Sequence, residues 1–447
     1  MKAGKANYVM RGITVQRMVG EVARHLGFPQ NGRRRTILSY VSIGTIAALL
    51  LAACGTSSSS STGSTAATAV THKSSSGSPV IFNAILSETG PGAFLGSHEA
   101  KVLKILEKQV NSAGGIDGHP LQMKIIDNQS SPSTAVSEAT SLISKGVPFF
   151  LNGSIGNVDE AVDALSTPSG PFIYDLAPDV HPAPGSKVFS AFFSLTSEVE
   201  SYLAFLKSKH LTNLATLTAV QSDQSFTLLK NLLSQPKYSA FHLVSAQTFD
   251  AGAVSVTAQL SVIKAQNPQA LIVLTTGTPL GTVLNGMSSL GMDNLPTIAD
   301  SGNGSFAEMA HFSSVLPKNF YLPITSMSIP ASQLPSGVAQ RKADASFQSL
   351  IKNAGGKPGS AWGIAWDPAN LIIDALKHLG AHATSNQILN YMENLHNVPG
   401  VMGVYNTSVS NHRGLSINDI YIASWDGTKF VLASGPGGAP LSKSGAQ

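Results

Sequence analysis

Few residues in this sequence have the types and spacing that covalent catalysis or metal binding needs. The G-x-S-x-G turn that exposes a nucleophilic serine is absent, and the twelve histidines show neither H-E-x-x-H nor any other metal-ligand spacing. The run GNGSFA at 302–307 matches a loose dinucleotide fingerprint, but it comes late and has no acidic residue about 20 positions further on. We therefore expect no enzyme activity, no cofactor and no metal site.

The only cysteine is the residue with the most specific chemistry. Cys54 follows Leu51-Ala52-Ala53, which closes an apolar run that begins at Thr36, directly behind Arg33-Arg34-Arg35. A basic flank, a short apolar core and small residues before a cysteine resemble a bacterial lipoprotein signal, in which the cysteine is lipidated after cleavage. The alternative is a true membrane anchor, because a run of about 18 residues is at the short end of what spans a bilayer.

Removal of such a signal peptide, residues 1–53, changes the charge of the protein. This segment holds 8 of the 29 Lys and Arg residues but only 1 of the 25 Asp and Glu residues, so the remainder carries a formal charge of −3. No basic patch for nucleic acid remains. The prediction is an extracytoplasmic monomer that is anchored to the membrane through a lipid on Cys54.

A composition change separates this signal from the folded part. Residues 55–79 contain 15 Ser or Thr among 25 residues, so they cannot bury enough apolar surface to order themselves. We expect residues 54–79 to be a tether.

From Pro79 onward, short apolar runs alternate with segments of helical spacing. Ser131-Pro132 begins one predicted helix, which Gly146 ends, and Gly114-Gly115 ends an earlier one. Asp426-Gly427 predicts a hairpin turn. Buried strands are expected at 80–86, 147–151, 171–174, 214–218 and 271–275. This alternation predicts an α/β fold with mainly parallel sheets flanked by helices, and the length favours two lobes.

One segment resembles a known family. VNSAGGIDGHPL at 110–121, followed by IDNQSSP at 126–132, is similar to the N-x-x-GGI-x-G-x-x-L … D-x-x-x-x-P pattern of periplasmic binding proteins of the leucine/isoleucine/valine type. The likeness extends over most of residues 80–432. These proteins are the solute receptors of branched-chain amino-acid ABC transporters, and the resemblance implies their type I fold of two α/β lobes with three hinge crossings.

The resemblance also implies a domain layout and a function. Lobe one would comprise 80–197 and 327–398, lobe two 198–326 and 399–435, and residues 436–447 a flexible tail. A small polar ligand, such as an amino acid or an amide, would lie between the lobes and pass to ABC permease subunits in the membrane. The alternative function is a ligand-sensing receptor lipoprotein that signals through a membrane partner.

Candidate ligand contacts in lobe one follow from the same resemblance. The loop with Ser154, Gly156 and Asn157 matches the place where the family holds the ligand carboxylate with hydroxyls and backbone amides, although Asn157 could instead cap the next helix. Ala177 matches a carbonyl that accepts from the ligand amine. Asp179 replaces a hydroxyl donor. Its carboxylate and that of Asp175 would favour a cation or a ligand with many hydrogen-bond donors, or either could be a solvated loop charge.

Further candidates lie on the first loop and in lobe two. Phe94 and Leu95 replace one aromatic residue of the family, and Phe226 matches an aromatic residue that packs over the ligand. Ser301 falls where amino-acid receptors place the acid that pairs with the ligand ammonium, and Asp300 could replace that acid after a shift by one residue. The remaining candidates, at a strand end, are Thr276 and Gly277.

Overall fold

The computed structural model describes residues 77–178, 180–335 and 337–441. The predicted signal peptide, Cys54, most of the tether and the candidate Asp179 lie outside these residues.

The first lobe is built on a five-stranded parallel sheet in the order β2-β1-β3-β4-β5. Its strands are β1 (Val80–Leu86), β2 (Leu121–Asp127), β3 (Phe149–Asn152), β4 (Phe172–Asp175) and β5 (Val188–Ser190). Asn152 pairs in register with Asp175, and Asp175 with Ser190. The last residues of three neighbouring strands are therefore level, and the loops that follow them meet at one edge of the sheet.

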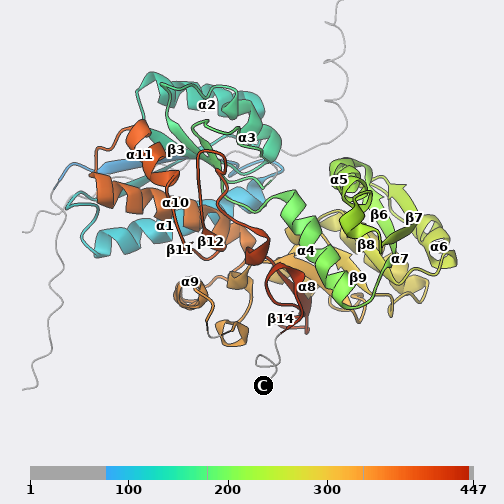
Figure 1. Ribbon diagram of the computed structural model, residues 1–447. Helices are drawn as coiled ribbons and strands as arrows, with labels where there is room; N and C mark the ends of the chain where they lie inside the picture. Colours follow the sequence, from blue (N-terminus) through green and yellow to red (C-terminus); the bar gives the residue numbers. More distant parts are fainter. Residues whose placement is uncertain (1–76, 179, 336, 442–447) are drawn as a thin grey trace, which may run out of the picture. The chain divides into compact units, whose positions relative to one another are not determined.

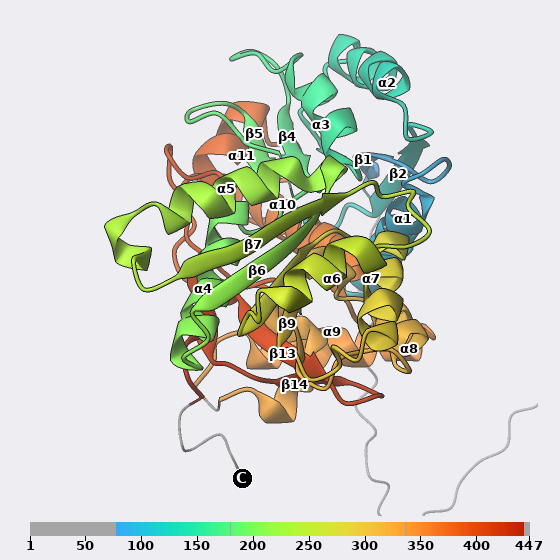
Figure 2. The same ribbon diagram turned by 90° about the vertical axis from the view of Figure 1, so that its right-hand side faces the viewer.

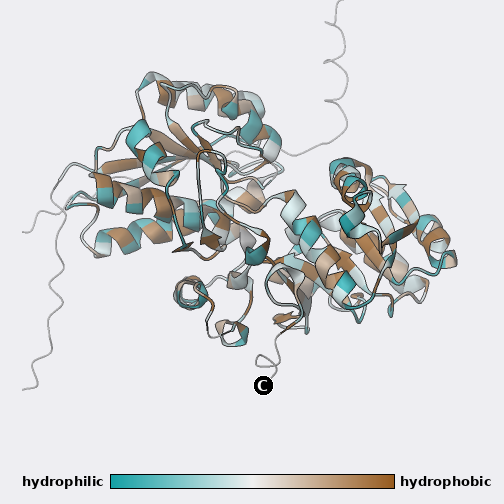
Figure 3. Ribbon diagram, in the orientation of Figure 1, coloured by the Kyte–Doolittle hydropathy of each residue, from teal (hydrophilic) through white to brown (hydrophobic). Residues whose placement is uncertain are grey.

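Helices cover both faces of this sheet (Figure 1). In β3, Phe149 and Leu151 face one hydrophobic cluster and Phe150 faces the other, as the alternation of a strand requires. Figure 3 shows the resulting brown, apolar strands between helices with teal outer faces. One face packs against α2 (Pro132–Ser144) and α3 (Gly156–Asp163), and the other cluster includes α1 (Ala93–Ser112), α9 (Arg341–Asn353), α10 (Ser360–Leu379) and α11 (Ser385–Met392).

The second lobe has a seven-stranded sheet in the order β14-β13-β10-β9-β8-β6-β7. Five strands are parallel: β6 (Asn213–Ala219), β7 (His242–Phe249), β8 (Ala270–Leu274), β9 (Thr297–Ala299) and β10 (Phe320–Ile324). An antiparallel hairpin of β13 (Tyr421–Trp425) and β14 (Phe430–Leu432) extends the sheet beyond β10. The turn predicted at Asp426-Gly427 is confirmed, since the Asp426 N–H donates to the Lys429 carbonyl at 3.1 Å.

This second sheet is also covered on both faces (Figure 2). One cluster contains α4 (Leu195–Ser208) and α5 (Asp223–Leu233), and the other contains α6 (Thr257–Ala265), α7 (Thr278–Ser289) and α8 (Phe306–Phe312). Each lobe thus has its own apolar core on both sides of its sheet. The fold class and the two-lobed arrangement predicted from the sequence are confirmed.

The third passage of the chain between the sheets comes later than the sequence suggested. A short antiparallel pair, β11 (Val398–Pro399) and β12 (Val404–Tyr405), precedes β13. The buried Asp367 carboxylate on α10 accepts from the N–H groups of Val401 (2.9 Å) and Met402 (2.7 Å) and from the Tyr405 hydroxyl (3.0 Å). This segment therefore packs with lobe one, and the boundary expected at residue 399 is too early.

The predicted tail also begins too early. Pro436–Gly438 forms a turn of 3-10 helix, and Gly438 is buried. A Cβ atom on Gly438 would lie 1.9 Å from the Ser201 carbonyl oxygen on α4. Because only glycine permits this close approach, residues 436–438 belong to the second lobe.

The local signals that were used to place helix ends agree with the structure. The Ser131 hydroxyl accepts from the Thr134 N–H at the start of α2, and Pro132 is the first helical residue. Gly115, after α1, has φ +78°, and a Cβ atom there would lie 2.1 Å from the His119 carbonyl oxygen. Ser131 follows β2, at the edge of the sheet where the candidate site residues lie, whereas Gly115 precedes β2, at the opposite edge.

Candidate functional site

Ser154, at the end of β3, is already hydrogen bonded to a buried acid. Its hydroxyl donates to the carboxyl group of Glu99, which comes from the second turn of α1. The Ser87 N–H approaches the Ser154 oxygen at 3.4 Å, and all three residues are buried. The hydroxyl that the resemblance assigned to a ligand carboxylate is thus directed at a carboxyl group of the protein itself.

Burial determines the protonation of Glu99. Loss of hydration raises the pKa of Glu99 to about 8, and the hydrogen bond with Ser154 offsets only part of this rise. Glu99 therefore keeps its proton at neutral pH. Burial of a neutral carboxyl group between α1 and the sheet costs much less free energy than burial of an isolated carboxylate.

A second polar network fixes the loops around Ser154. The Asn128 side chain, after β2, accepts from the Ser87 hydroxyl at 2.8 Å and donates to the Gly153 carbonyl at 2.6 Å. Helix α1 packs so closely here that a Cβ atom on Gly96 would lie 2.3 Å from the Ser87 carbonyl oxygen. This edge of lobe one is a tightly packed polar layer.

Three aspartates gather next to this layer, at the ends of β4 and α3. Asn152 donates to the Asp175 carboxyl group at 2.8 Å, and the Asp159 carboxylate accepts the Ala177 N–H at 3.0 Å. Burial first, and then the charges of Asp163 and Asp159, raise the pKa of Asp175 well above its usual value. Burial also raises the pKa of Asp163 to about 6. Asp175 is fully buried and is not a solvated loop charge.

The first turn of α3 rules out the alternative that Asn157 caps this helix. Ile155 is the N-cap of this helix, Gly156 is its first residue, and Asn157 is exposed on the second position. Asn157 therefore does not cap the helix. Its role as a ligand contact stays a prediction.

In lobe two, Ser301 holds a glutamate from α4. Glu198 accepts two hydrogen bonds from Ser301, one from the backbone N–H (2.7 Å) and one from the hydroxyl (2.9 Å). Both side chains are buried. Burial raises the pKa of Glu198, and the hydrogen bonds from Ser301 offset part of the rise. A carboxyl group therefore lies at the position where the sequence shows only a serine, but it comes from another element.

Asp300 lies close to this glutamate and is partly exposed. Burial, and then the charge of Glu198, raise the pKa of Asp300 well above its usual value. Burial and the charges of Asp300 and Glu198 also raise the pKa of Tyr202, one turn further along α4. Two carboxyl groups and a phenol, from α4 and from the end of β9, thus lie within electrostatic reach of one another.

The other candidates of lobe two are dispersed. The Gly277 N–H donates to the Asn303 side chain at 2.9 Å, and this side chain donates to the Thr275 carbonyl at 2.8 Å. Thr276 is exposed. Phe226 is half-buried against the α4 and α5 cluster, with the Lys230 ammonium 5.5 Å from its ring centre.

Phe94, Leu95 and Gly277 line cavities. Phe94 and Leu95, on the first turn of α1, are 56% and 37% exposed. Both line a cavity of about 530 Å³, whose other walls include Trp362 and Glu308, and this volume is in the size class of small-ligand sites. Phe94 also lines a cavity of about 540 Å³ with Gly277 and Glu308. The structure thus brings these three candidates together, whereas Ser154, Ala177 and Ser301 are buried at strand ends.

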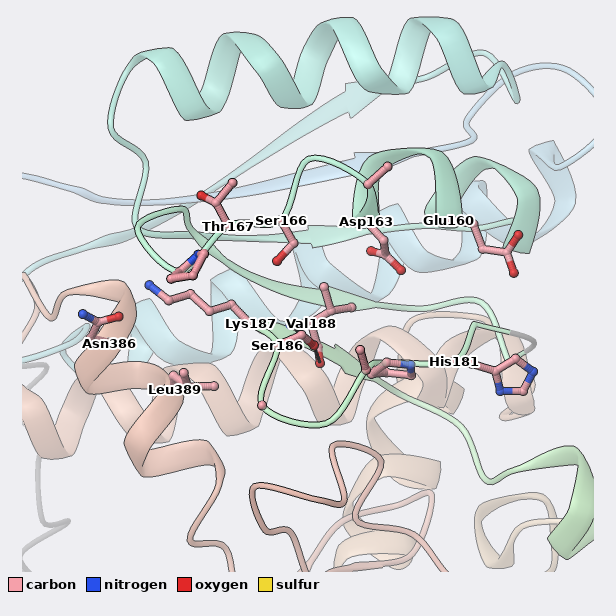
Figure 4. Close-up of a pocket in the computed structure, with 15 residues that line it drawn as sticks. Glu160, Asp163, Ser166, Thr167, His181, Ser186, Lys187, Val188, Asn386 and Leu389 are labelled. Carbon is pink, nitrogen blue, oxygen red and sulfur yellow. Dashed lines mark hydrogen bonds between the residues drawn. The ribbon is translucent and has the colours of Figure 1, made fainter.

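A further cavity of about 560 Å³ lies within lobe one and was not expected from the sequence (Figure 4). Asp163 and Glu160 of α3 line one wall, and Lys187 lies across the cavity from them. The Lys187 ammonium donates to the Gly170 carbonyl and to the Ser385 hydroxyl, both at 3.0 Å. The protein itself therefore already satisfies part of the hydrogen-bonding capacity of this ammonium group.

Two negative findings apply to residues 77–178, 180–335 and 337–441 only. In these ranges no three His, Cys, Asp or Glu side chains are arranged to hold a metal ion. No helix in the same ranges has both the length and the apolar character needed to cross a membrane.

Sequence reasoning missed the two glutamates that bind the predicted serines. Glu99 lies on the buried face of α1 with Gly96, Leu103 and Leu106, and Glu198 lies on the buried face of α4 with Tyr202. A charged residue within an otherwise apolar helical stripe was the available signal, because such a residue requires a polar partner or a proton.

The buried state of Glu99 predicts a specific pH dependence of stability. Its pKa is about 8 in the folded protein, against an ordinary value of 4.5 in the unfolded chain, so the folded state binds the proton more tightly. The corresponding stabilisation is complete below about pH 4.5 and is lost as the pH rises through 8. Relative to Glu99→Gln, the parent should lose a few kcal/mol of unfolding free energy between pH 5 and pH 8.5. The reason is that each pH unit between the two pKa values changes the unfolding free energy by about 1.4 kcal/mol.

Urea unfolding of the parent and Glu99→Gln across this pH range measures the difference directly. Glu88→Gln, an exposed position beside Ser87, is the control and should follow the parent. A difference between Glu99→Gln and the parent that stays constant with pH would show that Glu99 does not retain its proton.

Comparisons with known proteins agree with this architecture. A model of the periplasmic binding protein family matches residues 83–429. An extracellular ligand-binding receptor from Rhodopseudomonas palustris HaA2 superposes with a TM-score of 0.66 at 20% identity, over 79% of this chain and 99% of that one. A search of curated protein sequences finds no match.

Two further solved structures have names that state a ligand class. The branched-chain amino acid transporter substrate binding protein LivJ from Streptococcus pneumoniae, in complex with isoleucine, has a TM-score of 0.65 at 19% identity, over 78% of this chain and 97% of its own. A leucine-, isoleucine-, valine-, threonine- and alanine-binding protein from Brucella ovis has a TM-score of 0.66 at 16% identity, over 82% and 95%. At these identities the likeness shows the fold alone, and together with the family match it shows that the chain belongs to the type I periplasmic binding proteins.

Proposed function

We propose that this protein is an extracytoplasmic, lipid-anchored receptor that binds a small polar ligand between its two lobes and delivers it to an ABC permease. The observation that carries the proposal is the pair of α/β lobes, each of which has polar side chains at the carboxyl ends of its parallel strands. In open α/β sheets, ligands bind at these strand ends. The names of the similar structures, which include transporter substrate-binding proteins, support the importer role.

Binding would couple to closure of the lobes. Each lobe has its own hydrophobic clusters, so the lobes can move as units about the segments that join them. A ligand that contacts both lobes only in the closed state shifts the equilibrium toward that state, by as much as its affinities for the two states differ. A closed receptor presents a different surface to a membrane partner than an open one.

The anchor can be tested at Cys54. Replacement of Cys54 by Ala removes the thiol that would carry the lipid, so this variant should lose metabolic labelling with a fatty acid and should accumulate unprocessed or be released from the membrane. Ser57→Ala, in the neighbouring tether, is the control and should be labelled and retained. Membrane retention and processing of Cys54→Ala as in the parent would rule out the lipoprotein proposal.

Closure can be tested on a soluble fragment that begins at Pro79. A thermal-shift screen with amino acids, amides, amines and aromatic acids identifies compounds that stabilise the folded state, by linkage. Small-angle scattering should then show a smaller radius of gyration with each such compound, and no change with compounds that give no shift. Stabilising compounds that leave the radius unchanged would contradict binding between the lobes.

A further inference from the structure

Ser154 and Ser301, the two candidate serines that follow parallel strands, each bind a glutamate of the protein. In lobe one, the Ser154 hydroxyl donates to Glu99. In lobe two, the Ser301 N–H and hydroxyl both donate to Glu198. The hydroxyl groups of both serines are therefore used inside the protein, and a carboxyl group lies next to each of them.

Carboxyl groups at these strand ends have no basic partner in the described part of the chain. None of the ion pairs there includes Glu99, Glu198 or Asp300. A ligand carboxylate would meet further carboxyl groups and would lose its hydration without gaining an opposite charge. An ammonium or amidinium group would instead gain the partner that these acids lack.

A second observation at the end of β9 points to a bound polar group. The Tyr202 hydroxyl is buried and has no hydrogen-bond partner within the described residues, although the side chain is only 2% exposed. Ile298 of β9 packs in the same cluster as Tyr202. Because strand residues alternate, Asp300 leaves the sheet on the face of Ile298 and hence toward Tyr202. An unpaired buried hydroxyl beside two carboxyl groups is costly unless another polar group binds there.

We infer that the ligand is an organic amine without a carboxylate, whose cationic group is bound by Asp300, supported by Glu198 and Tyr202. Asp300 is the partly exposed member of this group, so it makes the direct contact. Glu99 is a specificity-determining residue of lobe one, because it withholds the Ser154 hydroxyl from any ligand carboxylate. This inference rests on the proposed receptor function and names the ligand class of that same site.

Matched pairs of compounds test the ligand class. Calorimetric titration of the full-length protein in detergent micelles would compare cadaverine with lysine, agmatine with arginine, and isoamylamine with leucine. The members of each pair differ only by the α-carboxylate. At least one amine should bind about tenfold or more tightly than its amino acid, because the carboxylate of the amino acid loses its hydration without gaining an opposite charge. Tighter binding of the amino acid in a pair that binds would overturn the inference.

Variants at the end of β9 test the contact. Asp300→Asn should weaken the amine about tenfold or more. Asp293→Asn is the matched control, since Asp293 is also partly exposed but precedes β9, whereas Asp300 follows it. If Asp300→Asn does not fold, Tyr202→Phe removes only the hydroxyl and should weaken the amine several-fold. Unchanged amine affinity in the folded variants would overturn the inference.

The ligand class and the receptor function fail in different ways. If a compound with a carboxylate binds tightly and reduces the radius of gyration, the receptor function stands and the amine inference is wrong. If no amine, amino acid, amide or sugar binds the full-length protein, both are wrong.

Discussion

A carboxyl group that is buried without a base must keep its proton, accept several hydrogen bonds or bind a cation, and this constraint governs both lobes of the protein. Glu99 in lobe one and Glu198 in lobe two enter from helices and reach the serines that follow parallel strands. Burial raises the pKa of both groups, so their charge depends on what lies beside them. The fold delivers these acids to the strand ends, which is where a ligand of this family would bind.

The level ends of neighbouring strands explain why these groups act together. In lobe one, the register of β3, β4 and β5 brings Asn152, Asp175 and Ser190 into one row. In lobe two, the end of β9 carries Asp300 and Ser301 beneath α4. Carboxyl groups lie at the strand ends of both lobes, Asp175 in lobe one and Asp300 with Glu198 in lobe two. The receptor function together with these groups leads to the amine as ligand class.

Much of the architecture could be predicted from the sequence because it depends on local patterns. Ser131-Pro132, Gly115 and Asp426-Gly427 determine the ends of elements through contacts within a few residues. Alternating strands and helices were sufficient for the fold class. The passage near residue 399 was misplaced because the segment after β11 is held by Asp367, a buried acid on a distant helix that no local pattern links to it.

The candidate site was harder to predict for the same reason. The resemblance located loops such as the one with Ser154, but it did not show that the Ser154 hydroxyl is directed at Glu99, a residue 55 positions earlier. Likewise Ser301 looked like the loss of an acid, whereas Glu198, 103 positions earlier, places a carboxyl group on it. Pairings between helices and strand ends are set by tertiary packing, and a single sequence does not encode them in any local spacing.

A crystal structure of the protein with a bound amine would test the central claim most directly. We predict the ligand nitrogen within hydrogen-bonding distance of the Asp300 carboxylate, near the Tyr202 hydroxyl, with the Ser154 hydroxyl still bonded to Glu99. A ligand carboxylate on the first turn of α3, with Ser154 turned away from Glu99 and toward that ligand, would contradict the account.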